Sequence, residues 1–245
     1  MAPPRPNPVA APPHVLELLN NLHKKSLEQE AAMTKTGNVF SANVLKDLED
    51  TAPKQDAKRQ FDALMLDKFI ALDQDKCQFV YQLILAMGAT NVVEAGTSFG
   101  VSTIYLALAV GENAQRQGRE GRVIATEKEA EKAKVARGYW KDCGETVEKY
   151  IDLREGDLLQ TLKKDVSQVD LLLLDIWTPL ALPTVEILKP HMRPGTVILA
   201  DNTEMGAVGY EQFLTYMRDP KNGFRNMTIP FNNGFEMSVY MPESQ

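Results

Sequence analysis

The sequence predicts an α/β protein with a Rossmann-like, doubly wound sheet of seven strands, mostly parallel and finished by a C-terminal antiparallel hairpin. Three observations predict this fold. Short apolar runs alternate with helix-like segments from residue 91 to residue 218. These runs are apolar on both faces, which is typical of parallel strands covered by helices on both sides. Two later strand-like runs are joined by the sequence NNG, which is a hairpin signal.

The N-terminal part has no strand-like run and predicts a helical preface. Residues 1–13 are rich in proline and are expected to form a disordered tail outside the core. Residues 14–88 are expected to form a helical cap or lid. In its first helix an apolar face is expected from Val15, Leu18, Leu19, Leu22 and Leu27. The expected helices of the preface are 14–33, 41–50, 52–72 and 74–88, the last ended by a glycine.

Residues 89–245 are expected to form the main domain, in one globular unit with the cap. The expected parallel strands are 91–95, 122–126, 150–154, 170–175 and 196–201. The expected helices are 102–116, 129–143, 157–164, 180–189 and 207–218. The hairpin strands are expected at 224–231 and 235–241.

Composition narrows the function classes. The chain of 245 residues has a net charge of −6 and scattered basic residues, so no nucleic-acid footprint is expected. No apolar run reaches the ~18–20 residues that span a bilayer, so no membrane partner is expected. Two cysteines without metal-ligand spacing indicate buried thiols in a reducing compartment, and we expect a cytoplasmic location.

The turn after the first strand is rich in glycine. Ligands of open parallel sheets lie beyond the carboxyl ends of the strands, and here the chain reads VVEAGTSFGVST. Gly96 and Gly100 would let the backbone approach a ligand, and Ser102 would lie near the start of the next helix. The spacing differs from the dinucleotide-binding G-x-G-x-x-G. A tight strand-to-helix turn explains the glycines equally well.

Two later strand ends add nucleoside contacts. Glu127 ends the second strand, where a carboxylate accepts hydrogen bonds from both hydroxyls of a ribose. Gly156 and Asp157 follow the third strand, in position to flank an adenine. The fifth strand ends in Asp201 and Asn202, whose oxygens suit a divalent cation. An Asx turn or a helix cap is the alternative for this pair.

With these motifs, residues 60–241 resemble class I S-adenosylmethionine-dependent O-methyltransferases, and most closely the cation-dependent catechol and caffeoyl-CoA enzymes. The resemblance implies a methyltransferase fold with S-adenosylmethionine as the cofactor. The cofactor-binding residues that it implies are Leu72, Glu94, Gly96, Thr97, Ser98, Gly100, Ser102, Glu127, Lys128, Asp157, Leu158, Asp175 and Trp177.

The same resemblance implies a metal site and a catalytic position. The metal ligands would be Asp175, Asp201 and Asn202, with Mg²⁺ as the expected ion and Ca²⁺ or Mn²⁺ as alternatives. Asp175 and Thr178 are the catalytic candidates. The family places a lysine, taken to be the general base, where this chain has Thr178, so the base is left open.

Three functions remain from the sequence. The leading one is metal-dependent O-methylation of a small aromatic molecule with neighbouring hydroxyls. The alternatives are a metal-independent small-molecule methyltransferase and a catalytically silent methyltransferase-like binding protein. The sequence leaves open whether the helical preface forms a homodimer contact. It does not identify the acceptor molecule.

Overall fold

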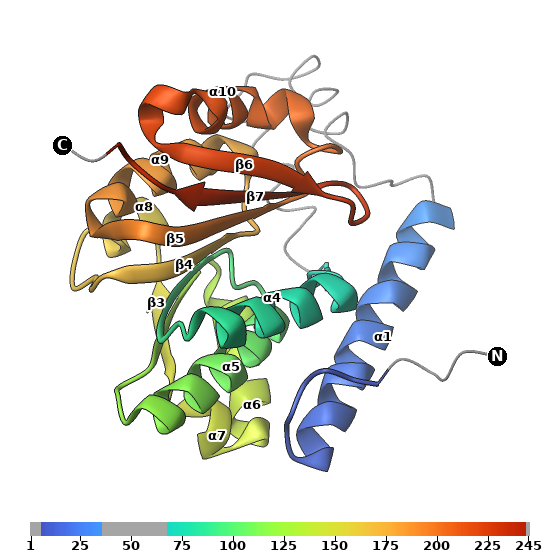
Figure 1. Ribbon diagram of the computed structural model, residues 1–245. Coiled ribbons are helices and arrows are strands. Elements are labelled where there is room, and N and C mark those ends of the chain that lie inside the picture. Colours follow the sequence, from blue (N-terminus) through green and yellow to red (C-terminus); the bar gives the residue numbers. More distant parts are fainter. Residues whose placement is uncertain (1–5, 36–67, 244–245) are drawn as a thin grey trace.

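The computed structural model describes residues 6–35 and 68–243, and its centre is a seven-stranded sheet in the order β3-β2-β1-β4-β5-β7-β6 (Figure 1). The first five strands in this order are parallel, whereas β7 runs antiparallel to both β5 and β6. The predicted sheet is therefore confirmed. The strands are β1 (Asn91–Ala95), β2 (Arg122–Glu127), β3 (Ile151–Glu155), β4 (Val169–Leu174), β5 (Met192–Asp201), β6 (Phe224–Ile229) and β7 (Phe235–Tyr240).

Helices cover both faces of the sheet. One face carries α1 (Pro13–Lys35), α4 (Gln74–Met87), α5 (Val101–Gln117), α6 (Ala130–Cys143) and α7 (Glu145–Glu148). The other carries α8 (Leu158–Thr161), α9 (Thr178–Leu188) and α10 (Ala207–Arg218), as Figure 1 shows. Two short 3₁₀ helices, Lys189–His191 and Pro220–Asn222, precede β5 and β6.

The central strands are apolar on both faces because they fill two separate cores. In β4, Leu171 and Leu173 join the core beneath α4 and α5, while Leu172 and Leu174 join the core beneath α9 and α10. All six residues of β4 are buried. This is the pattern expected for strands whose side chains alternate between two helix layers.

The N-terminal segment is more closely packed than the sequence predicts. Val9 is only 5% exposed and belongs to the core, and the backbone N–H of Ala10 donates to the Tyr81 hydroxyl. The expectation that this segment lies outside the core is therefore wrong for its described part. In α1 the predicted apolar face is buried at Val15, Leu19 and Leu22. At its C-terminal end, Leu27 is 62% exposed and Ser26 is buried in its place.

Two expectations for the helical preface meet the structure only in part. The predicted helix 41–50 lies outside the described residues, as does most of the predicted helix 52–72. Residues 68–72, its last turn, form no helix in the structure. They run as an irregular segment towards α4, at the edge of the sheet where the site lies. Elsewhere the main differences are a shorter α8 and a β5 that begins four residues earlier, at Met192.

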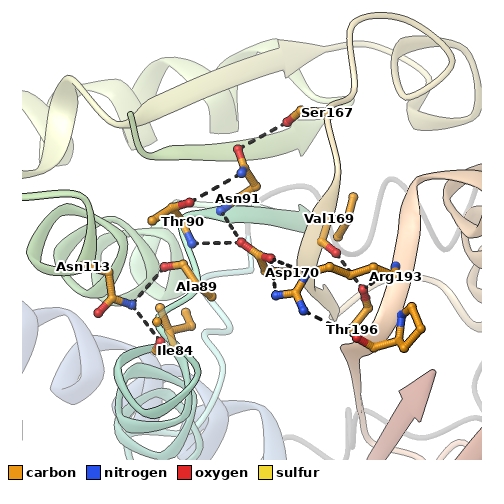
Figure 2. A network of polar contacts seen from close by, with 12 residues as sticks. Ile84, Ala89, Thr90, Asn91, Asn113, Ser167, Val169, Asp170, Arg193 and Thr196 are labelled. Carbon is orange, nitrogen blue, oxygen red and sulfur yellow. Dashed lines mark hydrogen bonds and ion pairs between the residues drawn. The ribbon is translucent and has the colours of Figure 1, made fainter. Parts of the chain in front are cut away.

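The amino ends of the strands are joined by a polar network (Figure 2). Asp170 at the start of β4 accepts hydrogen bonds from the backbone N–H groups of Thr90 and Asn91, both at 3.0 Å. Its second oxygen accepts from the Arg193 guanidinium at 2.8 Å. The network ties β1, β4 and β5 together at the end opposite the site and leaves their carboxyl ends for ligand contacts.

Two sequence expectations outside the sheet can also be compared with the structure. Cys77 and Cys143 are both buried free thiols, as predicted. Among the helices within 6–35 and 68–243, none combines the length and apolar character needed to cross a membrane.

Candidate functional site at the carboxyl ends of the strands

Backbone hydrogen bonds connect the loops at the carboxyl ends of the central strands. The N–H of Asp175 donates to Ala95 O at 3.0 Å, and the N–H of Thr97 donates to Thr126 O at 2.9 Å. Next along the sheet, the N–H of Gly156 donates to Glu127 O at 2.9 Å. The predicted site residues after β1, β2, β3 and β4 are therefore carried by adjoining loops.

Gly96 is required where this first loop passes β4. Its φ is +94°, and a Cβ atom there would lie 2.0 Å from the backbone oxygen of Asp175. No side chain fits without moving the chain, so the glycine brings β1 and β4 together. The close approach at Gly96 is therefore to the backbone of Asp175, whereas the sequence predicts a close approach to a ligand.

Gly100 is required by a tryptophan from α6. Its φ is +78°, and a Cβ atom would lie 2.6 Å from Nε1 of Trp140, which donates a 3.0 Å hydrogen bond to Gly100 O. Trp140 thus fixes the end of the loop from behind. The sequence analysis missed this residue, although a tryptophan among the small residues of the α6 stripe is a usable signal.

Glu94 is buried completely and organises the loop from within. Its carboxylate accepts hydrogen bonds from the hydroxyls of Thr97, Ser102 and Thr103, at 2.7, 2.6 and 2.6 Å. Burial raises the pKa of Glu94, while the three hydroxyl donors oppose that rise. Glu94 and Ser102 therefore stabilise the shape of the loop from inside the protein.

Glu127 lies at the position expected for a ribose-binding acid. Its two carboxylate oxygens accept 2.7 Å hydrogen bonds from the backbone N–H groups of Ser98 and Glu129. Burial raises its pKa, and these N–H groups together with Lys132 oppose the rise. The adjoining Lys128 side chain is exposed and pairs with Glu129 at 3.6 Å. Because each carboxylate oxygen has a further lone pair, Glu127 can still accept from two hydroxyls.

A hollow lies beside Glu127 and the first loop. Its walls come from three places in the chain: the segment 69–72, the loop and helix start at 96–102, and Asp175. The lining residues are Phe69, Ile70, Ala71, Leu72, Gly96, Thr97, Ser98, Phe99, Val101, Ser102 and Asp175. Six of the predicted cofactor residues, Leu72, Gly96, Thr97, Ser98, Ser102 and Asp175, therefore meet at one place.

Helix α1 holds the segment 69–72 against this hollow. Ser26 Oγ accepts a hydrogen bond from the Ala71 N–H at 2.9 Å, and Gln29 Oε1 accepts from the Phe69 N–H at 2.9 Å. The Lys25 ammonium lies 4.3 Å from the centroid of the Phe69 ring. The N-terminal helix thus forms part of the support of the site.

Three further predicted cofactor residues, Asp157, Leu158 and Trp177, are not among the lining residues of the hollow. Asp157 is exposed and caps α8 by accepting from the Leu159 N–H at 2.9 Å. Leu158 is half-buried, as is Trp177, which precedes the first residue of α9. They follow β3 and β4, and their contacts with a cofactor stay predictions.

The three predicted metal ligands follow adjacent strands. Asp175 comes directly after β4, Asp201 ends β5, and Asn202 follows with φ +58°, a left-handed conformation that asparagine tolerates. Asn202 Nδ2 donates a 3.0 Å hydrogen bond to Asp201 Oδ2. A half-turn of this amide would present its oxygen at the same place.

Lys76 of α4 is the functional candidate that the sequence analysis missed. The side chain is 1% exposed, and its Nζ lies 2.7 Å from Asp201 Oδ1 and 3.0 Å from Asp73 Oδ2. The signal is a lysine on the buried stripe of an amphipathic helix, one turn before Val80 and two before Ile84.

The charges at this edge are predominantly negative. Burial, with the nearby carboxylates of Asp201 and Glu94, raises the pKa of Asp175, and Lys76 opposes the rise. Burial also raises the pKa of Asp201, against the stabilisation by Lys76. When Asp73, Asp175 and Asp201 are ionised, three carboxylates face one ammonium, so two negative charges remain.

A divalent cation fits this set of residues chemically. Two carboxyl groups and an amide offer the oxygen ligands that Mg²⁺ prefers. Within 6–35 and 68–243, no three His, Cys, Asp or Glu side chains are grouped to hold a metal. The candidate ligands therefore comprise only Asp175, Asp201 and the Asn202 amide.

Thr178 packs against α10. A Cβ atom at Gly209 would lie 2.1 Å from Thr178 Oγ1, and one at Gly206 would lie 3.4 Å from Thr178 Cγ2. The two glycines thus make room for the Thr178 side chain. This contact gives the threonine a packing role between α9 and α10, and its catalytic role stays a prediction.

Comparisons with known proteins agree with the fold. Residues 93–203 match the family model of the methyltransferase domain. The catechol O-methyltransferase of Niastella koreensis is 30% identical over 140 residues, covering 54% of this chain and 58% of the relative. The probable caffeoyl-CoA O-methyltransferase 2 of Dictyostelium discoideum is 29% identical over 110 residues, covering 44% of each chain. The matches thus span about half the length of the curated relatives.

Solved structures extend the similarity over more of the chain. Cofactor-bound Rv0187 from MTB has a TM-score of 0.63 and 26% identity, covering 71% of this chain and 83% of that one. More distant structures of the same fold, at 16 to 20% identity, contain S-adenosylmethionine or S-adenosylhomocysteine. The predicted resemblance is confirmed.

Proposed function

From the match of residues 93–203 to the methyltransferase-domain model, we propose that the protein transfers the methyl group of S-adenosylmethionine to a hydroxyl oxygen of a small molecule. One observation carries the proposal. The hollow lined by 69–72, the loop after β1 and Asp175 lies beside the Glu127 carboxylate, which suits a ribose. The catechol and caffeoyl-CoA O-methyltransferases among the relatives support hydroxyl oxygen as the acceptor atom.

The reaction is a direct displacement at the methyl carbon. The acceptor oxygen forms a bond to this carbon while the carbon–sulfur bond breaks, and its electron pair stays on the sulfur. The hydroxyl proton goes to water or to Asp175. The protein's main task is to hold the two reactants in line, which can remove a large share of the barrier. The loop shaped by Glu94 and fixed by Trp140 supplies the rigid side of this alignment.

We further propose a divalent cation, with Mg²⁺ first and Ca²⁺ or Mn²⁺ as alternatives, and an aromatic acceptor with two neighbouring hydroxyls. Asp175, Asp201 and Asn202 would hold the ion. A bound divalent cation lowers the pKa of a coordinated hydroxyl and fixes the position of its oxygen. The positions of these residues, directly after β4 and at the end of the neighbouring β5, support this assignment.

Turnover of matched acceptors tests these proposals. The full chain is incubated with S-adenosylmethionine and Mg²⁺, and with either catechol-type acceptors or the same rings carrying one hydroxyl. Mass spectrometry then measures the methylated product. We expect product from the neighbouring-hydroxyl acceptors only, and its loss in EDTA. Product retained in EDTA would favour metal-independent transfer, and cofactor binding without any product would favour a silent binding protein.

A further inference from the structure

The buried ammonium of Lys76 is not used in the reaction described above. It comes from α4, outside the loops that follow the strands, yet it reaches the carboxylate at the end of β5. Thr178, the other residue considered as a source of a functional group, carries no charge and packs against α10. Lys76 is therefore the cation that the described structure places against a proposed metal ligand.

Stability alone does not account for a lysine at this position. Burying an ammonium and a carboxylate costs several kcal/mol per ion, and apolar replacement of such pairs is often neutral or stabilising. The neighbours Cys77, Val80 and Ile84 on the same stripe of α4 are apolar and buried. A methionine or leucine would continue that stripe at lower cost, so the pair needs another explanation.

The ammonium is restrained on several sides. Asp201 Oδ1 lies 2.7 Å from Nζ, and Asp73 Oδ2 lies 3.0 Å from it. The centroid of the Phe235 ring is 5.9 Å away, and Phe235 is the β7 partner of Asp201 in the sheet. Three elements thus hold one donor against one oxygen of Asp201. Lys76 engages Oδ1, whereas Oδ2 accepts from the Asn202 amide and keeps a further lone pair for another ligand.

We propose that Lys76 is a positioning residue for cation binding: it holds Asp201 by Oδ1 so that Oδ2 and the Asn202 amide are presented together to a divalent ion. This inference rests on the proposed function for the identity of the site.

Two physical effects of Lys76 predict opposite results when it is removed. As a positive charge it repels a cation, so its loss would tighten cation binding. As the anchor of a ligand it orders Asp201, and loss of such a partner typically weakens metal binding by about 10- to 100-fold. The positioning role therefore has a signature that neither charge nor general destabilisation reproduces.

Calorimetric titration of Mn²⁺ into the full chain, in the presence of S-adenosylhomocysteine, tests the proposal. The variants are Lys76→Met and Lys76→Gln, with Lys134→Met on the exposed face of α6 as the matched control. We expect Mn²⁺ affinity to fall about 10- to 100-fold in both Lys76 variants and to stay within about twofold in the control. Affinity for S-adenosylhomocysteine should stay within about twofold throughout. If Lys76→Met does not fold, judged by circular dichroism, Lys76→Gln decides by the same criterion.

Unchanged or tighter Mn²⁺ binding by the Lys76 variants would overturn the inference, as would a wild-type chain that binds no Mn²⁺. Failure of the proposed function gives a different result. In that case the wild-type chain binds no S-adenosylhomocysteine and methylates no acceptor, whatever its affinity for Mn²⁺.

Discussion

The indole Nε1 of Trp140 in α6 donates a 3.0 Å hydrogen bond to the carbonyl oxygen of Gly100, at the end of the loop after β1. The bond fixes the loop that lines the hollow, because Gly100 lies between the lining residues Phe99 and Val101. Gly100 has no room for a Cβ atom against the same indole ring. The shape of the proposed cofactor pocket therefore depends on a helix that does not line it.

Trp140→Phe should weaken S-adenosylhomocysteine binding about five- to tenfold, because the bond is worth about 1–1.5 kcal/mol and its loss leaves a buried carbonyl without a donor. Calorimetry on the full chain measures the affinity. Tyr139→Phe, the neighbouring substitution on α6, is the control and should bind like wild type. Equal affinities for wild type and Trp140→Phe would show that the loop holds its shape without the indole.

Gly96→Ala should abolish cofactor binding and Gly138→Ala should not. A Cβ atom at Gly96 would lie 2.0 Å from the Asp175 backbone oxygen, whereas one at Gly138 in α6 meets nothing within 4 Å. Gly138→Ala should raise the free energy of unfolding by about 0.5–1 kcal/mol, since alanine favours a helix. Urea denaturation measures the free energy of unfolding, and calorimetry measures the affinity for the cofactor. Normal binding by Gly96→Ala would contradict the close contact between β1 and β4.

Ser26→Ala should weaken S-adenosylhomocysteine binding about fivefold, since Ser26 Oγ accepts the Ala71 N–H that holds the pocket wall, a bond worth about 1 kcal/mol. The effect should appear in KM for S-adenosylmethionine, with kcat nearly unchanged. Leu27→Ala, at the adjoining exposed position of α1, provides the control. An effect of equal size in both variants would mean that α1 acts through general stability.

The sheet and part of the site could be predicted from the sequence, whereas contacts between distant segments could not. The alternation of apolar runs predicts the sheet, because each central strand fills two cores and must be apolar on both faces. The topology places Gly96 and Ser102 at a strand end, and the family resemblance adds Leu72, Thr97, Ser98 and Asp175; all six line one hollow.

Contacts that cross between distant segments were not predicted. Lys76 meets Asp201 across 125 residues of sequence, and no local pattern specifies that pairing. In α1, periodicity alone does not decide whether Ser26 or Leu27 continues the buried face after Leu22. The helix predicted to end at Leu72 gives way to an irregular wall segment held by α1. Tertiary contacts decided each of these cases.

Acid should destabilise the protein through His23. Its Nε2 lies 2.9 Å from the Tyr105 hydroxyl, and burial lowers the pKa of His23 to about 4. The unfolded chain takes up a proton near pH 6.5 and the folded chain does not until about pH 4. Stability is therefore fully present above about pH 6.5 and falls as the pH drops towards 4, by about 2 kcal/mol at pH 5.

Urea denaturation at pH 7.5 and pH 5 measures this loss. His23→Gln should be less sensitive to acid than the wild type, while replacement of the exposed His14 by glutamine should leave the wild-type difference in place. An equal loss of stability in the wild type and in His23→Gln would assign the acid sensitivity to other groups.

Thr178→Lys should lower the free energy of unfolding by about 1–3 kcal/mol, because the longer side chain has no space against Gly206 and Gly209 of α10. Its pH–rate profile should match that of the wild type, since the packed position is not expected to supply the base. Thr178→Ser is the conservative control. Faster turnover and a shifted profile in the lysine variant would instead make position 178 a base site.

A crystal structure of the full chain with S-adenosylhomocysteine tests the central claim most directly. The account predicts the ribose hydroxyls within hydrogen-bond distance of the Glu127 carboxylate, and the sulfur end between residues 69–72 and Asp175. A nucleoside bound elsewhere, or a cofactor that stays unbound at saturating concentration, would contradict it.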